Sequence, residues 1–156
     1  MARRPLALIC LALMLVRAVP AGAASPVAGF WLTEKRSAVV ELYDCGARLC
    51  GRIAWLAEPR AGDGSLRRDR DNPDPSKRDR PWCGLTVITG LERSGDGRWE
   101  GGRFYYPKHG RSYRIRLARE GRTLAVRAYL GVPLLGRSET WTPAGPEKRG
   151  CPVEAD

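Results

Sequence analysis

The hydrophobic pattern along most of the chain has a period of two residues. Between residues 111 and 117, arginine or serine alternates with apolar side chains, which places every second side chain on one face of an extended strand. A tight turn at Glu120-Gly121 follows, and the alternation resumes over residues 124–130. This pattern predicts two neighbouring antiparallel strands with one buried face.

Similar stretches recur along the rest of the chain, separated by short turns that contain glycine or proline. The further strands that they predict are Phe30–Thr33, Ala38–Tyr43, Leu49–Leu56, Leu85–Leu91, Arg98–Tyr105 and Leu134–Trp141. About eight short strands with regular spacing are typical of an all-β sandwich or barrel. Short turns favour a meander, and closing it removes both exposed sheet edges. We therefore predict an all-β fold, an antiparallel meander of about eight strands closed into a barrel.

One connection, residues 58–81, is much longer than the others. It contains seven basic and six acidic residues, so it is neither a polybasic nor an acidic tail. Loops of this length are usually functional or disordered. The loop is therefore a candidate for function, with a solvated insertion as the alternative.

The first 24 residues have the pattern of a secretory signal peptide. Arg3 and Arg4 precede an apolar run, residues 6–16, that is too short to span a bilayer. Small residues then offer a cleavage site after Ala23 or Ala24. We expect residues 25–156 to form a single periplasmic or secreted domain without a transmembrane segment.

Export makes disulfides the natural state of the four cysteines that remain after cleavage. Cys45 and Cys50 flank a predicted hairpin turn, where opposed Cα atoms lie about 5.5 Å apart, which suits a disulfide. We therefore pair Cys45 with Cys50 and, by elimination, Cys83 with Cys151. A zinc site is the alternative, although the spacing is not C-x2-C and the single histidine is remote.

Short motifs rich in glycine and tryptophan follow one another along the predicted mature chain. They lie within Gly29–Thr33, Cys45–Ile53, Asp71–Gly84, Trp99–Gly102, Tyr105–Tyr113 and Tyr129–Trp141. In this order they resemble the motifs of the exported bacterial family called domain of unknown function 2147. Tyr106 departs from the pattern, because an acidic residue usually precedes the proline there. The resemblance implies no established activity.

The residues Gly29-Phe30-Trp31 are also similar to the Gly-x-Trp motif that opens the first strand of lipocalin-type barrels. In those barrels the tryptophan plugs the closed end and an arginine near the last strand packs over it. The resemblance implies that role for Arg127 or Arg137, through a cation–π contact. We interpret Trp31 and Trp141 as structural, with an ordinary core aromatic as the alternative for Trp31.

A closed end at Trp31 places alternate turns at the opposite, open end. The long loop and the turn that carries the only histidine then share this end. The interior of such a barrel holds one small ligand or is filled by side chains. The candidate ligand-binding residues at the open end are Asp71, Asn72, Arg78, Arg80, Tyr106 and His109.

The chain is strongly basic, with a formal net charge of +10, and 24 bases against 17 acids remain beyond residue 24. Residues 93–127 hold ten bases and three acids, enough for a face that contacts a polyanion. The aromatic residues do not interleave with these bases, and an exported protein rarely meets genomic DNA. We therefore expect no nucleic-acid partner, and propose anionic envelope polymers or lipid headgroups instead.

Catalytic motifs are sparse. His109 lies beside a glycine in a turn, the chain lacks a Gly-x-Ser-x-Gly elbow, and Pro73 interrupts a calcium-loop spacing. We expect no enzyme activity, metal or cofactor. The leading hypothesis is an exported binding protein that holds a small apolar or amphipathic ligand in a lipocalin-like barrel. The alternative is a packed envelope interaction protein with a basic face, and the third hypothesis is a hydrolase that uses His109.

Overall fold

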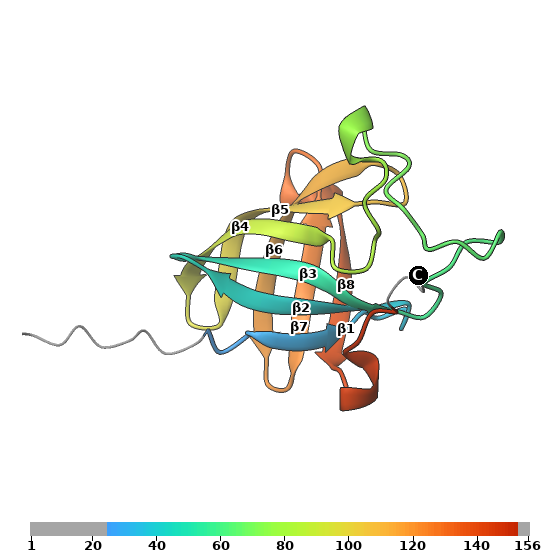
Figure 1. Cartoon of the computed structure of the whole chain (residues 1–156). Helices are drawn as coiled ribbons and strands as arrows, with labels where there is room; N and C mark the ends of the chain where they lie inside the picture. Colours follow the sequence, from blue (N-terminus) through green and yellow to red (C-terminus); the bar gives the residue numbers. More distant parts are fainter. Residues whose placement is uncertain (1–24, 153–156) are drawn as a thin grey trace, which may run out of the picture.

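The computed structural model describes residues 25–152, and the predicted signal peptide lies outside them. The strands are β1 (Gly29–Leu32), β2 (Ala38–Cys45), β3 (Arg48–Leu56), β4 (Thr86–Gly95), β5 (Arg98–Tyr106), β6 (Arg111–Glu120), β7 (Thr123–Tyr129) and β8 (Gly136–Pro143) (Figure 1). Three short 3-10 turns accompany them: η1 (Pro75–Lys77), η2 (Pro133–Leu135) and η3 (Pro146–Lys148). None of the helical segments in this part of the chain is long and apolar enough to cross a membrane.

The strands form one closed barrel in sequence order, and every neighbouring pair is antiparallel. The predicted all-β fold and the closure of the meander are confirmed. Several predicted strand boundaries are wrong: β4 extends to Gly95 and not only to Leu91, β2 extends to Cys45 and not only to Tyr43, and β8 begins at Gly136 and not at Leu134. Pro133 lacks an N–H and has a fixed φ, so it begins the η2 turn, in which Leu134 and Leu135 lie.

Alternate side chains of the strands fill the interior with a single apolar core. Its fully or nearly fully buried members are Val27, Trp31, Val40, Leu42, Leu49, Ile53, Leu85, Val87, Ile88, Leu91, Trp99, Ile115, Leu117, Leu124, Val126 and Trp141. Gly102 allows close packing, because a Cβ there would lie 2.6 Å from the Cγ atom of Leu91. The barrel is therefore filled by side chains over the part that this core occupies.

Trp31 packs inside the barrel toward the end at which β6 and β7 are joined, which we call the closed end. Its side chain is only 4% exposed, and its indole N–H donates to the carbonyl of Val27 at 2.8 Å. The arginine over the ring is Arg119, with Cζ 5.9 Å from the ring centroid, so the expectation of Arg127 or Arg137 is wrong. Arg119 lies near the end of β6, whereas Arg137 lies at the start of β8, at the opposite end.

A second, smaller apolar cluster lies outside the barrel wall. It consists of Leu32, Val39, Ala54 and Ala144, with Phe30 and Trp55 packed against it. The C-terminal tail follows this cluster, and two of its cations lie over aromatic rings. Arg149 lies 4.9 Å from the centroid of Phe30, and Lys148 lies 5.8 Å from that of Trp55. The tail therefore shields apolar side chains that strands β1 to β3 present outward.

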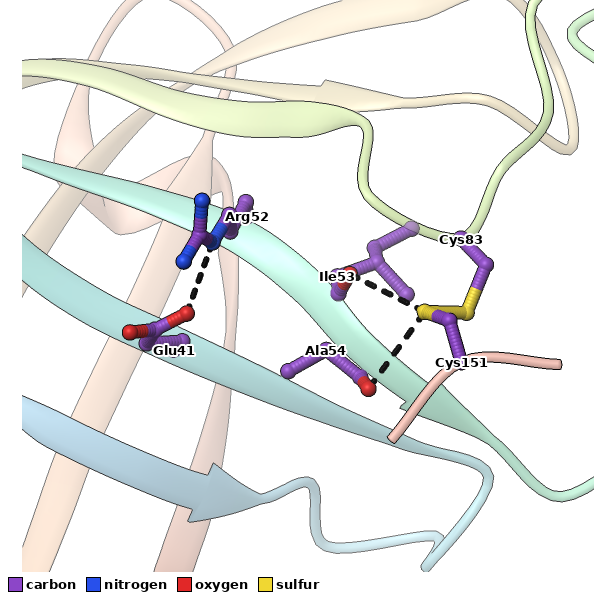
Figure 2. The surroundings of a disulfide bond; sticks show 6 residues. All are labelled: Glu41, Arg52, Ile53, Ala54, Cys83 and Cys151. Carbon is purple, nitrogen blue, oxygen red and sulfur yellow. Dashed lines mark hydrogen bonds and ion pairs between the residues drawn. A yellow bond between two sulfur atoms is a disulfide. The ribbon is translucent and has the colours of Figure 1, made fainter. Parts of the chain in front are cut away.

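Both predicted disulfides are confirmed. Cys45 and Cys50 join β2 to β3 across their hairpin with a Cα–Cα distance of 5.8 Å, and Cys83 and Cys151 are bonded with a distance of 5.7 Å. Figure 2 shows that Cys151 lies beside β3, where its sulfur is 3.4 Å from the carbonyl oxygen of Ala54. The second bridge thus fixes the tail to the barrel wall. These four cysteines are not zinc ligands.

Removal of the Cys83–Cys151 disulfide should destabilise the barrel more than removal of the Cys45–Cys50 disulfide. The entropy of the unfolded chain falls with the length of the closed loop, and the bridged residues are 68 and 5 positions apart. We expect Cys83→Ser/Cys151→Ser to lower the free energy of unfolding by about 4 kcal/mol, and Cys45→Ser/Cys50→Ser by about 2 kcal/mol. Urea unfolding followed by tryptophan fluorescence measures both losses. A larger loss for the hairpin bridge would contradict this expectation.

Candidate functional site

The long loop between β3 and β4 is fastened to β5 by a buried carboxylate. Asp69 has no exposed surface, yet three donors satisfy it. The hydroxyl of Tyr105 donates to Oδ1 at 2.5 Å, and Oδ2 accepts from Asn72 at 2.7 Å and from Arg80 at 2.9 Å. A buried charge is tolerated only with such partners. This network, which we call the Asp69 latch, positions the loop against the barrel.

Three predicted ligand-binding residues make contacts within the loop. Asn72 is 5% exposed, and its amide bridges Asp69 and the Tyr105 hydroxyl. The Arg78 Nε donates to the Asn72 carbonyl at 2.9 Å, and Arg80 forms the ion pair with Asp69. The structure therefore gives Asn72, Arg78 and Arg80 a fastening role, and sequence reasoning missed Asp69 and Tyr105. The spacing of residues within the loop does not show that Asp69 has a hydrogen-bond partner, Tyr105, on a strand distant in the sequence.

The latch changes the acidity of Tyr105. Burial, followed by the hydrogen bond to Asp69, raises the pKa of the phenol to about 12. A phenolate at this position would lose solvation and would face the Asp69 carboxylate across a short distance. The neutral phenol is therefore the form that holds the loop.

Asp71 and His109 lie together at the open end, as the sequence predicts. With Lys108 and Arg111 they line a hollow of about 530 Å³ beside the β5–β6 turn. Gly110 in that turn has a φ of +59°, and a Cβ there would collide with the Asp71 carbonyl. Loop and turn are therefore in direct contact, and Figure 1 shows them on the same side of the barrel.

The chemistry of this hollow suits an anion. Lys108, Arg111 and His109 outnumber the single carboxylate of Asp71, and the Tyr106 ring lies edge-on to His109 with centroids 5.3 Å apart. Within residues 25–152, no hydrogen bond joins the His109 ring to a hydroxyl or a carboxylate. The same part of the chain contains no group of three or more histidine, cysteine or acidic side chains placed to hold a metal.

The inner wall near the open end carries a second set of residues. Inward-facing positions alternate along each strand, so the positions that continue the core toward this end follow from the register. These mouth residues are Phe104, Tyr113, Ala128, Arg137 and Glu139. Phe104 pairs with Tyr113, Ala128 pairs with Arg137, and Arg137 is exposed whereas the others are half-buried. The mouth is therefore part aromatic and part charged.

Glu139 is the mouth residue nearest to the core. It pairs with buried Val126 across β7 and β8, and its carboxylate accepts a hydrogen bond from the Trp141 indole at 3.0 Å. Trp141 itself is only 3% exposed, in agreement with the structural role expected for it. The alternation of β8 places Arg137 and Glu139 on the same face as Trp141. Because charged residues at these positions do not resemble those of a core strand, the sequence alone does not predict that they face inward.

A hollow of about 360 Å³ lies on the outer face of β5 to β8. Its charged lining residues are Arg98, Glu100, Arg116, Glu120 and Arg127. The core tryptophans line neither this hollow nor the one at the β5–β6 turn. The deep interior is thus packed, and the accessible chemistry lies at the open end and on this outer face.

Substitution of Tyr105 by Phe should weaken the Asp69 latch in a pH-dependent way. Near neutral pH we expect the free energy of unfolding to fall by about 2 kcal/mol, because a buried carboxylate loses a donor. The pKa in the folded state, about 12, lies above the ordinary value of 10.0. The stabilisation is therefore present in full below about pH 10 and is lost as the pH rises through about 12.

Urea unfolding of both proteins at increasing alkaline pH measures this effect. The difference in the free energy of unfolding between the wild type and Tyr105→Phe should shrink as the pH rises from about 10 through about 12. Tyr129→Phe, at a half-buried tyrosine outside the latch, is the control and should show no such convergence. A difference that stays constant with pH would contradict the role of the phenol.

Comparison with solved structures supports the barrel. The chain is similar to protein HP1028 from Helicobacter pylori, which is described as belonging to the lipocalin family. The TM-score is 0.68 at 22% sequence identity, and the match covers 78% of this chain and 84% of that chain. At this identity the likeness shows a lipocalin-like fold. A search of curated proteins gives no match.

The comparison with family models covers nearly all of the barrel. The model described as "Uncharacterized protein conserved in bacteria (DUF2147)" matches residues 29–143, which extend from the first residue of β1 to the last residue of β8. The resemblance of the sequence motifs to this family is thereby confirmed. Since the match includes every strand, the chain belongs to the family of bacterial proteins called domain of unknown function 2147.

Proposed function

We propose that this protein is an exported, non-enzymatic binding protein that holds a small amphipathic molecule at the open end of its barrel. The observation that carries the proposal is the mixed character of the mouth. Half-buried Phe104 and Tyr113 lie opposite each other on β5 and β6, and exposed Arg137 lies on the same inner wall. The packed end at Trp31 leaves this end as the accessible one.

The packed core limits how deeply a ligand enters. Trp99, Leu117 and Trp141 are at most 3% exposed and fill the barrel below the mouth. The apolar part of the ligand therefore lies against Phe104 and Tyr113, which offer large contact areas at a low cost in side-chain entropy. A short acyl chain or a flat ring suits this depth better than a long lipid tail.

The charges at the open end favour an anionic head. Arg137 on the inner wall and Lys108, His109 and Arg111 at the β5–β6 turn provide donors for charge-assisted hydrogen bonds. Glu139, nearer the core, disfavours a second negative group deeper in the barrel. We infer that the head stays at the rim and the apolar part points inward.

Two further features support a binding role outside the cytoplasm. The signal-peptide pattern over residues 1–24 and the two disulfides fit an oxidising compartment. His109 has no hydroxyl or carboxylate hydrogen-bonded to its ring within residues 25–152, which leaves it without the partner that a catalytic base needs. The third hypothesis, a hydrolase, has the least support.

A second candidate function is contact with an anionic envelope surface through the outer face of β5 to β7. Arg103 lies directly opposite Arg114, and Arg116 lies opposite Arg127. Like charges directly opposite each other destabilise a sheet. Among the described residues, no acidic side chain forms an ion pair with any of these four. Glu100 and Glu120 line the outer hollow together with Arg116 and Arg127. The Arg103–Arg114 pair, which does not line that hollow, therefore gives the stronger support for an anionic polymer or headgroup as the partner.

Native mass spectrometry of protein purified from its own envelope tests the first function. We expect one small molecule bound per chain. 1-Anilinonaphthalene-8-sulfonate, an anionic amphipath with flat rings, should bind as well, and Arg137→Gln should weaken its binding by about tenfold through loss of a charge-assisted bond. Arg122→Gln, at the closed end, is the matched control and should bind normally.

Other outcomes would overturn this proposal. If no molecule co-purifies and 1-anilinonaphthalene-8-sulfonate does not bind, the mouth is not a ligand site. Equal binding of the probe by Arg137→Gln and by the wild type would show that Arg137 does not bind the anionic head. Hydrolysis of a nitrophenyl ester that His109→Ala abolishes would contradict a non-enzymatic role.

Binding to dextran sulfate at increasing salt tests the second function. Arg103→Gln/Arg114→Gln should weaken binding at low salt and reduce its salt dependence, because two phosphate-like contacts are lost. Lys35→Gln/Arg36→Gln removes the same charge from the exposed β1–β2 turn, away from this face, and should have a smaller effect. Equal effects of the two double variants would show that net charge alone acts.

A further inference from the structure

We propose that the β7–β8 loop inserts its apolar tip into an anionic lipid bilayer and anchors the open end of the barrel there. The inference rests on the second proposed function and deepens it. It names a lipid surface as the partner and the loop that enters it.

The loop exposes an unusual amount of apolar surface. Leu130 and Val132 are each 55% exposed, Leu134 is 86% exposed and Leu135 is 72% exposed. The one other large exposed hydrophobic side chain in residues 25–152, Tyr106, lies at the same end of the barrel. Apolar side chains clustered on a surface in this way mark a site of interaction.

Hydrogen bonds from Arg127 on β7, and one within the loop itself, fix the conformation of the loop. The Arg127 guanidinium donates to the Pro133 carbonyl at 2.8 and 2.6 Å and to the Ser138 hydroxyl at 2.7 Å. The backbone N–H of Leu135 donates to the Val132 carbonyl at 3.1 Å, which closes the η2 turn. These bonds satisfy backbone groups that a lipid environment cannot satisfy. The loop thus presents its leucines without first having to fold.

On the hairpins that adjoin the loop, the charges toward the open end are mostly positive. Residues 101–119 and 121–138 contain no acidic residue. The bases of these hairpins toward the open end are Arg103, Lys108, Arg111, Arg114 and Arg137, which we call the basic collar. Two acids lie near it, Asp71 in the hollow and Glu139 on the inner wall. Apolar tips within a basic surround match the boundary between acyl chains and anionic headgroups.

This arrangement favours a bilayer over a second copy of the chain. Two copies that met through these loops would bring their basic collars together, which costs electrostatic energy. A bilayer instead receives the leucines in its acyl region while the collar stays among the phosphates. In this orientation the mouth residues face the membrane.

Vesicle flotation tests the inference with the disulfide-bonded protein. Vesicles of phosphatidylcholine with phosphatidylglycerol should carry the wild type, whereas vesicles of phosphatidylcholine alone should carry much less. Leu134→Ser/Leu135→Ser should weaken binding by about tenfold or more, because two apolar side chains no longer enter the acyl region. Arg111→Gln/Arg137→Gln should weaken it mainly at low salt. Arg122→Gln at the closed end is the control.

Insertion of the loop into the acyl region can be measured separately from binding to the vesicle. Leu134→Trp should show fluorescence quenching by brominated acyl chains beyond that of the wild type, because a tryptophan at the tip enters the acyl region. Thermal unfolding of each variant checks that the barrel is intact. These side chains are exposed and lie outside the core, so the variants should unfold as the wild type does.

Each alternative has a distinct result. Salt-sensitive binding that survives loss of both leucines, without extra quenching of Leu134→Trp, would retain the second function and overturn insertion. Absence of wild-type binding to either vesicle, with dextran sulfate still bound, overturns insertion and leaves a polymer as the partner in the second function. Absence of binding to both the vesicles and dextran sulfate overturns the inference and the second function together. Equal binding to neutral vesicles overturns the role of the collar. A dimer in solution that Leu134→Ser/Leu135→Ser converts to a monomer would assign the loop to a second copy.

Discussion

Closure of the sheet between β1 and β8 is the constraint on which the rest of the structure depends. The seam is short, since Trp31 pairs with Pro143 and Leu32 with Thr142, and one more bond joins Ala144 to Phe30. Packing on both sides of the wall supports it. Trp31 fills the closed end from within, while the C-terminal tail covers the outer cluster and is fixed by the Cys83–Cys151 bridge. An open sheet would instead expose two edges.

This closure divides the barrel into two chemically different ends. Aromatic and aliphatic side chains leave little space at the Trp31 end, so the proposed binding site lies at the other end. There the Asp69 latch holds the long loop against β5, and the hollow at the β5–β6 turn forms where loop and turn meet. The latch and the hollow have different roles, although their residues are neighbours in sequence: Asn72 fastens the loop, whereas Asp71 lines the hollow.

The sequence predicts the strands, their order and both disulfides because these depend on local alternation, turn residues and the parity of cysteines. It also places the long loop and His109 at one end, since alternate turns of a meander must meet there. Contacts between segments that are distant in the sequence are harder to predict from it. The position of Arg119 over Trp31 depends on how the barrel is tilted, and the bond between Asp69 and Tyr105 depends on the path of a long loop. Similarly, Arg137 and Glu139 face inward because β8 alternates, but their charge resembles that of an outer face.

The central claim is that the open end of this barrel is a binding site and the rest of it is a packed scaffold. The most direct measurement is a titration of the isotope-labelled protein with decanoate, followed by amide chemical shifts in NMR spectra. The account predicts saturable shifts concentrated at Phe104, Tyr113 and Arg137, with the β2–β3 and β6–β7 turns unchanged. Saturable shifts confined to those turns, or none anywhere, would contradict it.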